Sequence, residues 1–278
     1  MRITKRKKKI IFTTVGIVVT ALMLFPVYWM FITSIKPLNE IYVDPPLFFP
    51  SDPTIQPYID IFTSKNSMLH YMKNSFIIGS GSMLLTLALA APAAYGLARK
   101  KLIGVVILMG ILIATQMFPS IIMATPLYII FLNIGLTDSF TGLIIANTTN
   151  LLPFAIILLR PFFLGLPKEL EEAALMDGCN KFMSFWKVIL PLTRTGLITV
   201  GTFTFLMAWN ELLFALTLSN DNSMRPVTVG IYSYMGEYAA EWNNLMAASF
   251  VSSLPIIFAF IFLQKYIVNG LTTGTTKG

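Results

Sequence analysis

The sequence is poor in the residues that build metal sites, disulfides and nucleotide-binding loops. It contains one cysteine (Cys179) and one histidine (His70) in 278 residues. A single cysteine rules out a disulfide within the chain, and a single histidine cannot supply a histidine-based metal site. The GxxxxGK[ST] loop that cradles nucleotide phosphates is also missing. We therefore do not expect this chain to bind ATP by that route, or to act as an enzyme.

Charged residues are scarce as well, at 12% of the chain against 55% hydrophobic residues. Apolar runs of about twenty residues without charge are typical of helices that cross a lipid bilayer. Such runs cover residues 10–35, 74–98, 102–120, 139–159, 195–218 and 244–264. The fold class predicted from them is an all-α integral membrane protein with six transmembrane helices. The charge-free stretch that starts at residue 102 continues to residue 137, and Pro119 and Pro126 divide it, so we expect a looser segment after residue 120. The fifth run is interrupted at Glu211.

The basic residues predict how the chain lies in the membrane. Six of the 20 Lys and Arg fall within the first nine residues, directly before an apolar run that is too long for a signal peptide. With this N-terminus in the cytoplasm, sixteen basic residues lie on cytoplasmic segments and four lie outside. Positive residues collect on the cytoplasmic side of membrane proteins. Both termini and the loop 160–194 are therefore predicted to be cytoplasmic, and the net charge of +7 requires no nucleic-acid partner.

The loop 160–194 contains an acidic stretch, EEAALMDGCN, at residues 171–180. Its composition predicts a short helix that ends at Gly178, followed by a second helix capped by Asn180. In the second helix, apolar residues recur at i, i+3, i+4 and i+7 and can pack on the spans of the protein itself. They are Phe182, Phe185, Trp186 and Ile189. The acidic helix suits either docking in a groove of another protein or simple solvation, and its residues alone leave both open.

Three groups of residues in this loop resemble the EAA loop of ABC importer permeases. Glu172-Ala173-Ala174, Asp177-Gly178 and Leu190-Pro191 keep the order and spacing of that loop, and they precede the penultimate span as it does. Cys179 departs from the family pattern, in which Ala is common. The tail 270–278 is similar to the end of MalG-type carbohydrate permeases, so the resemblance covers nearly the whole chain.

The resemblance implies a helix-turn-helix coupling loop that docks on a cytoplasmic ATPase. The coupling residues carried over are Glu171, Glu172, Ala173, Ala174, Asp177 and Gly178. It also implies the partners: a MalF-type second permease, two ABC ATPase subunits that bind ATP and magnesium, and an extracellular sugar-binding protein. The expected organisation is a basic N-terminus (1–9), a permease domain (10–268) with the coupling loop at 162–194, and a cytoplasmic tail (269–278).

Polar residues inside the predicted spans are candidates for the substrate pathway. Sugar hydroxyls require hydrogen-bond donors and acceptors, but the same side chains can also join helices to one another. The candidates are Asn147, Thr148 and Asn150 in the fourth span, Asn210 and Glu211 in the fifth, and Gln116 beside Pro119. Glu211 is the one acidic residue within a predicted span, and a structural or gating role is favoured for it over contact with the sugar.

The function implied is that of a permease subunit in the plasma (inner) membrane. It would form, with the second permease, the pore for a sugar or oligosaccharide. An ABC permease for another solute, such as glycerol phosphate, and a self-contained secondary transporter are the alternatives. A secondary transporter would usually show internal repeats and more ionisable groups within the spans. The sequence does not identify the sugar.

Overall fold

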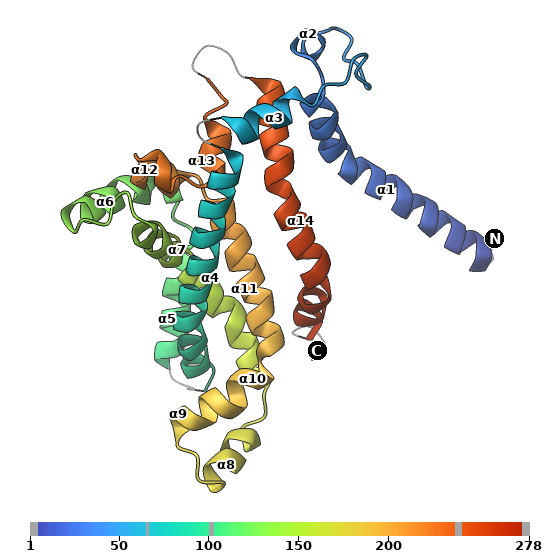
Figure 1. The fold of residues 1–278 in the computed structure, drawn as a ribbon. Helices are drawn as coiled ribbons and strands as arrows, with labels where there is room; N and C mark the ends of the chain where they lie inside the picture. Colours follow the sequence, from blue (N-terminus) through green and yellow to red (C-terminus); the bar gives the residue numbers. More distant parts are fainter. Residues whose placement is uncertain (1–4, 65–66, 100–102, 237–240, 274–278) are drawn as a thin grey trace. The chain divides into compact units, whose positions relative to one another are not determined.

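The structure is a computed structural model that describes residues 5–64, 67–99, 103–236 and 241–273. It is built from helices joined by short connections (Figure 1). The long helices are α1 (Lys5–Ser34), α4 (Met68–Arg99), α5 (Ile103–Thr115), α6 (Ser120–Asn133), α7 (Phe140–Leu164), α11 (Arg194–Trp209) and α14 (Trp242–Thr273). The short ones are α2 (Leu38–Ile41), α3 (Gln56–Thr63), α8 (Glu169–Met176), α9 (Lys181–Ser184), the π-helical η1 (Phe185–Ile189), α10 (Leu190–Leu192), α12 (Leu213–Leu218), η2 (Asn222–Met224) and α13 (Val227–Tyr232).

Within the described residues, four helices are long and apolar enough to cross a membrane, and six spans result if each of two bent helix pairs counts as one. The bend in the third predicted span is sharp, because α5 and α6 meet at 94°. Pro119 occupies the N-cap of α6 and has extended backbone (φ −61°, ψ 131°). The proline ring fixes φ near this value. The expectation of a looser segment after residue 120 was wrong, since α6 forms a regular helix there.

The interruption predicted in the fifth span is present. Helix α11 ends at Trp209 and α12 begins at Leu213. Between them, the Glu211 carboxylate accepts hydrogen bonds from the backbone N–H of Phe214 (2.8 Å) and Ala215 (3.1 Å). The first N–H groups of a helix have no partner within the helix, so a carboxylate at this position satisfies them and favours a new helix start. Glu211 thus restarts the helix after the break.

The chain forms two compact units, Met1–Met68 with Ile231–Pro255, and Leu69–Gly230 with Ile256–Gly278. In the first unit, the rings of Phe31 and Phe250 lie 5.1 Å apart between α1 and α14. The second unit has two apolar clusters. One joins α4, α7, η1 and α11, and includes Ala94, Leu159, Phe163, Ile189 and Val200; the other joins α4, α6, α7, α12 and α13.

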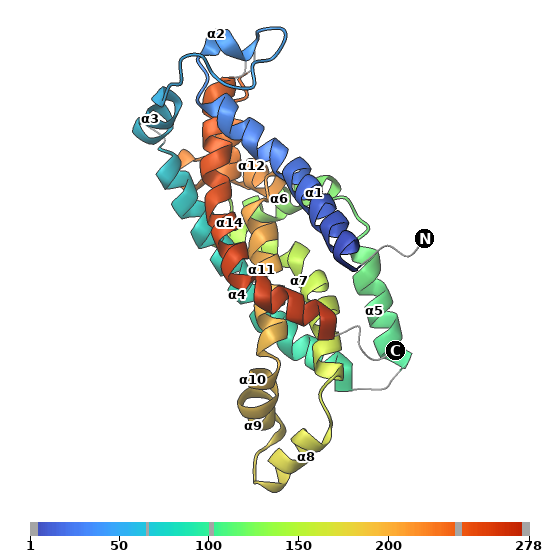
Figure 2. The same cartoon turned by 90° about the vertical axis from the view of Figure 1, so that its right-hand side faces the viewer.

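Within the second unit, α4, α5, α7 and α11 run alongside one another. Figures 1 and 2 both show α8 and α9 beyond one end of these helices, with α12 toward the opposite end. The helix-turn-helix segment is therefore a projection of the second unit, built on the ends of its long helices. Those ends position the candidate site.

We predict that the packing of α11 on α7 depends on Gly196. A Cβ atom at this position would lie 2.5 Å from Cγ of the Phe162 ring. Cγ is the ring atom bonded to the rest of the Phe162 side chain, so the ring cannot avoid the new methyl group by a small rotation. Gly196→Ala should therefore lower the free energy of unfolding by about 1–3 kcal/mol. Thermal unfolding in mild detergent measures this loss. Gly110→Ala is the control, since nothing lies within 4 Å of its added Cβ; equal melting temperatures for the two variants would contradict the prediction.

Candidate functional site

Helix α8 ends in a turn that only glycine adopts easily. Gly178 has a φ of +86°, in the left-handed region. The N–H of Cys179 donates to the carbonyl of Ala174 (3.0 Å), and the N–H of Gly178 donates to that of Leu175 (3.1 Å). This pair of bonds is a Schellman motif, which closes a helix C-terminus. Asn180 then starts α9 by accepting a hydrogen bond from the N–H of Met183 (2.8 Å), so the predicted helix, glycine stop and cap are confirmed.

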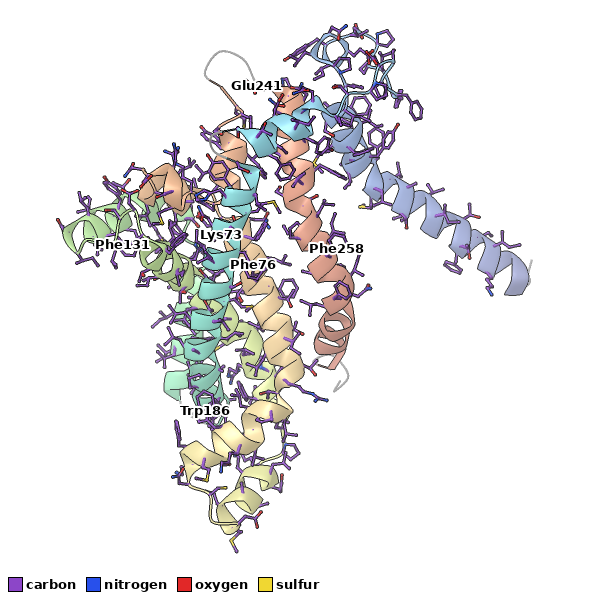
Figure 3. All side chains as sticks on the ribbon, in the orientation of Figure 1. Lys73, Phe76, Phe131, Trp186, Glu241 and Phe258 are labelled. Atoms are coloured by element: carbon purple, nitrogen blue, oxygen red, sulfur yellow. The ribbon has the colours of Figure 1, made fainter. Side chains whose placement is uncertain are left out.

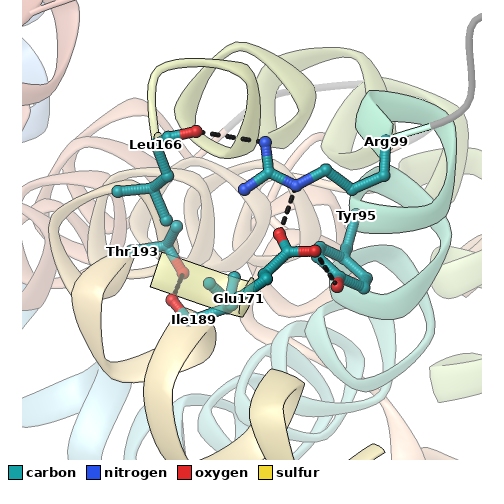
Figure 4. Close-up of polar contacts among 6 residues, drawn as sticks. All are labelled: Tyr95, Arg99, Leu166, Glu171, Ile189 and Thr193. Atoms are coloured by element: carbon teal, nitrogen blue, oxygen red, sulfur yellow. Dashed lines mark hydrogen bonds and ion pairs between the residues drawn. The ribbon is translucent and has the colours of Figure 1, made fainter. Parts of the chain in front are cut away.

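The inward side of α8 is fixed by a charged network (Figure 4). One carboxylate oxygen of Glu171 pairs with Nε of Arg99, at the end of α4. The other accepts a hydrogen bond from the hydroxyl of Tyr95 (2.9 Å), one turn earlier on α4. Nη1 of Arg99 donates to the carbonyl of Leu166, in the connection between α7 and α8 (3.1 Å). The network therefore joins three chain segments at one point.

Most of this network is withdrawn from solvent. The side chains of Arg99 and Glu171 are 13% and 20% exposed. Nη2 of Arg99 is buried and has no hydrogen-bond partner within the described residues. Separating two partly buried charges leaves each of them desolvated and unpaired, which is strongly unfavourable. The pair therefore resists any movement of α8 away from the end of α4.

The residues after Asn180 divide their apolar side chains between two faces. Phe185 and Ile189 are buried in the cluster with Tyr95 and Phe163, and the rings of Tyr95 and Phe185 lie 4.9 Å apart. Phe182 and Trp186 are exposed, and Figure 3 labels Trp186 near the ends of the long helices. Two of the four residues in the predicted apolar stripe therefore pack on the spans, and the other two do not. The π-helical winding of η1 precedes Pro191, which has no N–H to continue the ladder.

The opposite side of α8 faces outward. Glu172, Ala173, Leu175, Met176 and Asp177 are exposed, with Met176 at 89%. Ala174, one of the six coupling candidates, is buried and only 6% exposed. The structure therefore divides these candidates: Glu171 and Ala174 face the bundle, Gly178 forms the turn, and Glu172, Ala173 and Asp177 are accessible.

Three of the substrate-pathway candidates bond through their side-chain amides to backbone carbonyls. Asn147 and Thr148 are buried, and the Asn147 amide donates to the carbonyl of Leu143 in its own helix (2.9 Å). Gln116 donates to the backbone carbonyl of Asn150 (3.3 Å), which links α5 to α7. The Asn210 amide bonds to the carbonyl of Leu206 (2.8 Å). Their observed bonds are thus made to backbone carbonyls, and Asn210 adjoins the break that Glu211 caps.

The far end of the second unit holds its own polar network. The Asp138 carboxylate accepts from the backbone N–H groups of Asn220 (2.5 Å) and Asp221 (2.9 Å). The Asn74 amide donates to the carbonyls of Ser223 and Arg225, both at 2.9 Å. These bonds fasten the turn after α12 to α4 and to the loop before α7.

Sequence comparison places this arrangement in a family. Residues 87–273, which include α8 and the network around Arg99, match the family described as "Binding-protein-dependent transport system inner membrane component". The chain belongs to this family. Its members are membrane components of transport systems, so this chain is a transport subunit of the inner membrane and not an enzyme.

Individual relatives match over almost the full length. The chain is 36% identical to the sulfoquinovosyl glycerol transport system permease protein SmoH of Agrobacterium fabrum, over 92% of this chain and 89% of the relative. It is 37% identical to the trehalose transport system permease protein SugB of Mycobacterium tuberculosis, over 92% and 93%. Among solved structures, a bacterial ABC transporter involved in the import of the acidic polysaccharide alginate has a similar fold, with a TM-score of 0.79 at 22% identity, covering 96% of this chain and 98% of that one.

Two members of the site were not identified as such from the sequence. Tyr95 and Arg99 lie more than 70 residues before Glu171, and the carboxylate was assigned to a partner protein instead. One signal was available: Arg99 ends an apolar run next to the membrane surface, and the predicted topology puts it on the same side as the acidic loop. The choice between Glu171 and Glu172 depends on the rotation of α8, which the sequence does not fix.

We predict that Glu171→Gln loosens α8. The substitution keeps the shape of the side chain but leaves Arg99 without its counter-charge. Because the pair is partly exposed, a loss of about 1–2 kcal/mol is expected, which corresponds to about tenfold faster amide hydrogen exchange in residues 169–177. Hydrogen exchange with mass spectrometry measures this directly. Glu172→Gln, on the exposed side, is the matched control, and similar exchange in both variants would show that the network does not hold the helix.

Proposed function

We propose that this chain is a MalG-type permease subunit of an ATP-driven importer for a sugar or oligosaccharide. The family supports a role in binding-protein-dependent transport, and the relatives named for trehalose and for sulfoquinovosyl glycerol support a carbohydrate substrate. The partners would be a second permease, two cytoplasmic ABC ATPases that hold ATP and magnesium, and an extracellular sugar-binding protein. The excess of basic residues on the segments 1–9, 99–101 and 160–194 supports cytoplasmic termini and a cytoplasmic coupling loop.

The observation that carries the proposal is the two-sided character of α8. Its inner side is bound to α4 through Glu171, and its outer side presents accessible apolar and acidic groups. A helix that transmits force between two proteins must be fixed to one and accessible to the other. Met176 and Ala173 would supply apolar contact with a groove of the ATPase, while Glu172 and Asp177 would meet basic residues at its rim.

The same geometry suggests how motion would pass to the spans. When the ATPases close, α8 would move with them, and the Arg99–Glu171 pair would carry that displacement to the end of α4. Transport requires the spans to alternate between two arrangements that the nucleotide biases. No bond in the sugar is made or broken by this subunit.

We propose a structural role for Glu211 and Asn147, which satisfy backbone groups of their own chain. Asn210, beside the helix break, and Gln116 are the more accessible of the pathway candidates. A discontinuous helix places backbone groups near a substrate route, as broken helices do in other transporters.

Docking can be tested without disturbing the fold by enlarging Ala173. Ala173→Trp adds bulk on the exposed side of α8 and should abolish co-purification of the ATPase, while the second permease remains bound. Ala173→Ser, which adds only a hydroxyl at the same exposed position, is the matched control and should retain the ATPase. Gly178 is a poor test position because its φ of +86° disfavours any side chain, whether or not it touches a partner. Loss of the second permease as well, or retention of the ATPase by Ala173→Trp, would contradict the proposed surface.

The substrate class requires a transport measurement. Proteoliposomes that contain the complete complex should import a sugar or oligosaccharide only with ATP inside and the binding protein outside. We expect uptake of at least one member of a panel of labelled disaccharides and oligosaccharides, and none of glycerol phosphate or short peptides. Uptake of glycerol phosphate alone would favour the alternative solute, and uptake without ATP would contradict an ATP-driven importer.

A further inference from the structure

The segment that follows α1 folds back along that helix. The carbonyl of Phe48 accepts a hydrogen bond from the hydroxyl of Tyr28 (2.7 Å). The rings of Phe48 and Trp29 lie 5.8 Å apart, and those of Phe49 and Tyr28 lie 6.4 Å apart. Tyr28 and Trp29 precede the end of α1 at Ser34 by about 8 Å along the helix axis. Phe48 and Phe49 therefore lie at a level within the apolar run of α1, not beyond its end.

A buried lysine holds this segment in place. Lys36 is only 2% exposed. Its ammonium group donates to the carbonyl of Leu47 (2.5 Å) and lies 4.6 Å from the centre of the Trp29 ring. A carbonyl dipole and an aromatic face both attract a cation, so they partly replace its lost hydration. Lys36 thus ties residue 47, and with it the two phenylalanines, to α1.

The two phenylalanines nevertheless expose most of their surface. Phe48 is 58% exposed and Phe49 is 73% exposed. Residues 46–50 carry no charge, whereas the acidic residues of the same loop (Glu40, Asp44 and Asp52) lie on either side of this stretch. If the loop extended into water, we would not expect two exposed aromatic rings to lie beside Tyr28 and Trp29 on α1. Tyr and Trp are enriched at the boundary between lipid chains and headgroups, and the two phenylalanine rings pack on Tyr28 and Trp29.

We propose that residues 47–49 are a membrane anchor, inserted into the interfacial layer of the bilayer beside α1 and held there by Lys36 and Tyr28. The occupant of this surface is lipid, because the patch continues the outer surface of α1, whose most apolar stretch has no buried residue in the described structure. The anchor would fix the depth and tilt of α1 relative to the bilayer. This inference does not depend on the transported solute, since it concerns only how the first span is seated.

The test measures the environment of residue 49 in the assembled transporter. Phe49→Cys, in a Cys179→Ser background, is labelled with a nitroxide and reconstituted with its co-purifying partners in phosphatidylcholine nanodiscs. Oxygen, which partitions into lipid, and a water-soluble nickel chelate then relax the spin label to different extents. Asp52→Cys, on the exposed part of the same loop, is the matched water reference.

We expect the label at residue 49 to be several-fold more accessible to oxygen than to the nickel chelate, with the reverse order at residue 52. High accessibility of residue 49 to the chelate would place the loop in water and overturn the anchor. Low accessibility to both reagents would show that another protein covers the patch, and would overturn it equally.

A second pair of substitutions tests what holds the anchor. Lys36→Met should move the label at residue 49 toward the chelate, because it removes the ammonium that binds Leu47. Tyr28→Phe keeps the ring and removes only the hydrogen bond to Phe48, so a smaller shift in the same direction is expected. If neither substitution changes the accessibility of residue 49, the proposed fastening is wrong. Should Lys36→Met fail to assemble, the Tyr28→Phe comparison still decides.

Discussion

A charge pair at the end of α4 is the interaction on which the candidate site depends. Apart from the contact between Arg99 and Glu171, α8 is held by its two chain connections and by its packing against η1 and α9. The pair is withdrawn from water, and Tyr95 and the Leu166 carbonyl complete its hydrogen bonding. It fixes the rotation of α8, and that rotation determines which residues remain for a partner.

Interrupted helices shape the rest of the second unit. Pro119 turns the chain between α5 and α6, and Glu211 restarts the fifth span as α12. Each break exposes backbone groups that a membrane cannot hydrate. Backbone turn bonds from Gln116, Met117 and Phe118 satisfy N–H groups at the first break, and the Glu211 side chain does so at the second. At the second break an acidic side chain serves the backbone, since the Glu211 carboxylate accepts from the N–H groups of Phe214 and Ala215.

The sequence predicts the parts of the structure that depend on local rules. Apolar runs locate the long helices, Gly178 and Asn180 mark the turn between α8 and α9, and Glu211 marks the break in the fifth span. Packing between segments that are distant in the chain could not be predicted from the sequence. Pro119 directly before α6 and Pro126 within it suggest irregular chain, yet α6 is helical and is stabilised by contact with α7 and α12. The partner of Glu171 and the burial of Ala174 likewise depend on how α8 is rotated against α4.

The most direct measurement is the distance between α4 and α8 during the ATPase cycle. Spin labels at Leu89 on α4 and Glu169 on α8, in a Cys179→Ser background, report it by pulsed electron resonance in the complete transporter. If Arg99 and Glu171 bind the two helices into one body, the distance distribution will be the same in the nucleotide-free and ATP-bound states, while Glu171→Gln broadens it. A shift of several ångströms between the two states in the unaltered network would show that α8 moves independently of α4 and would contradict the central role of the pair.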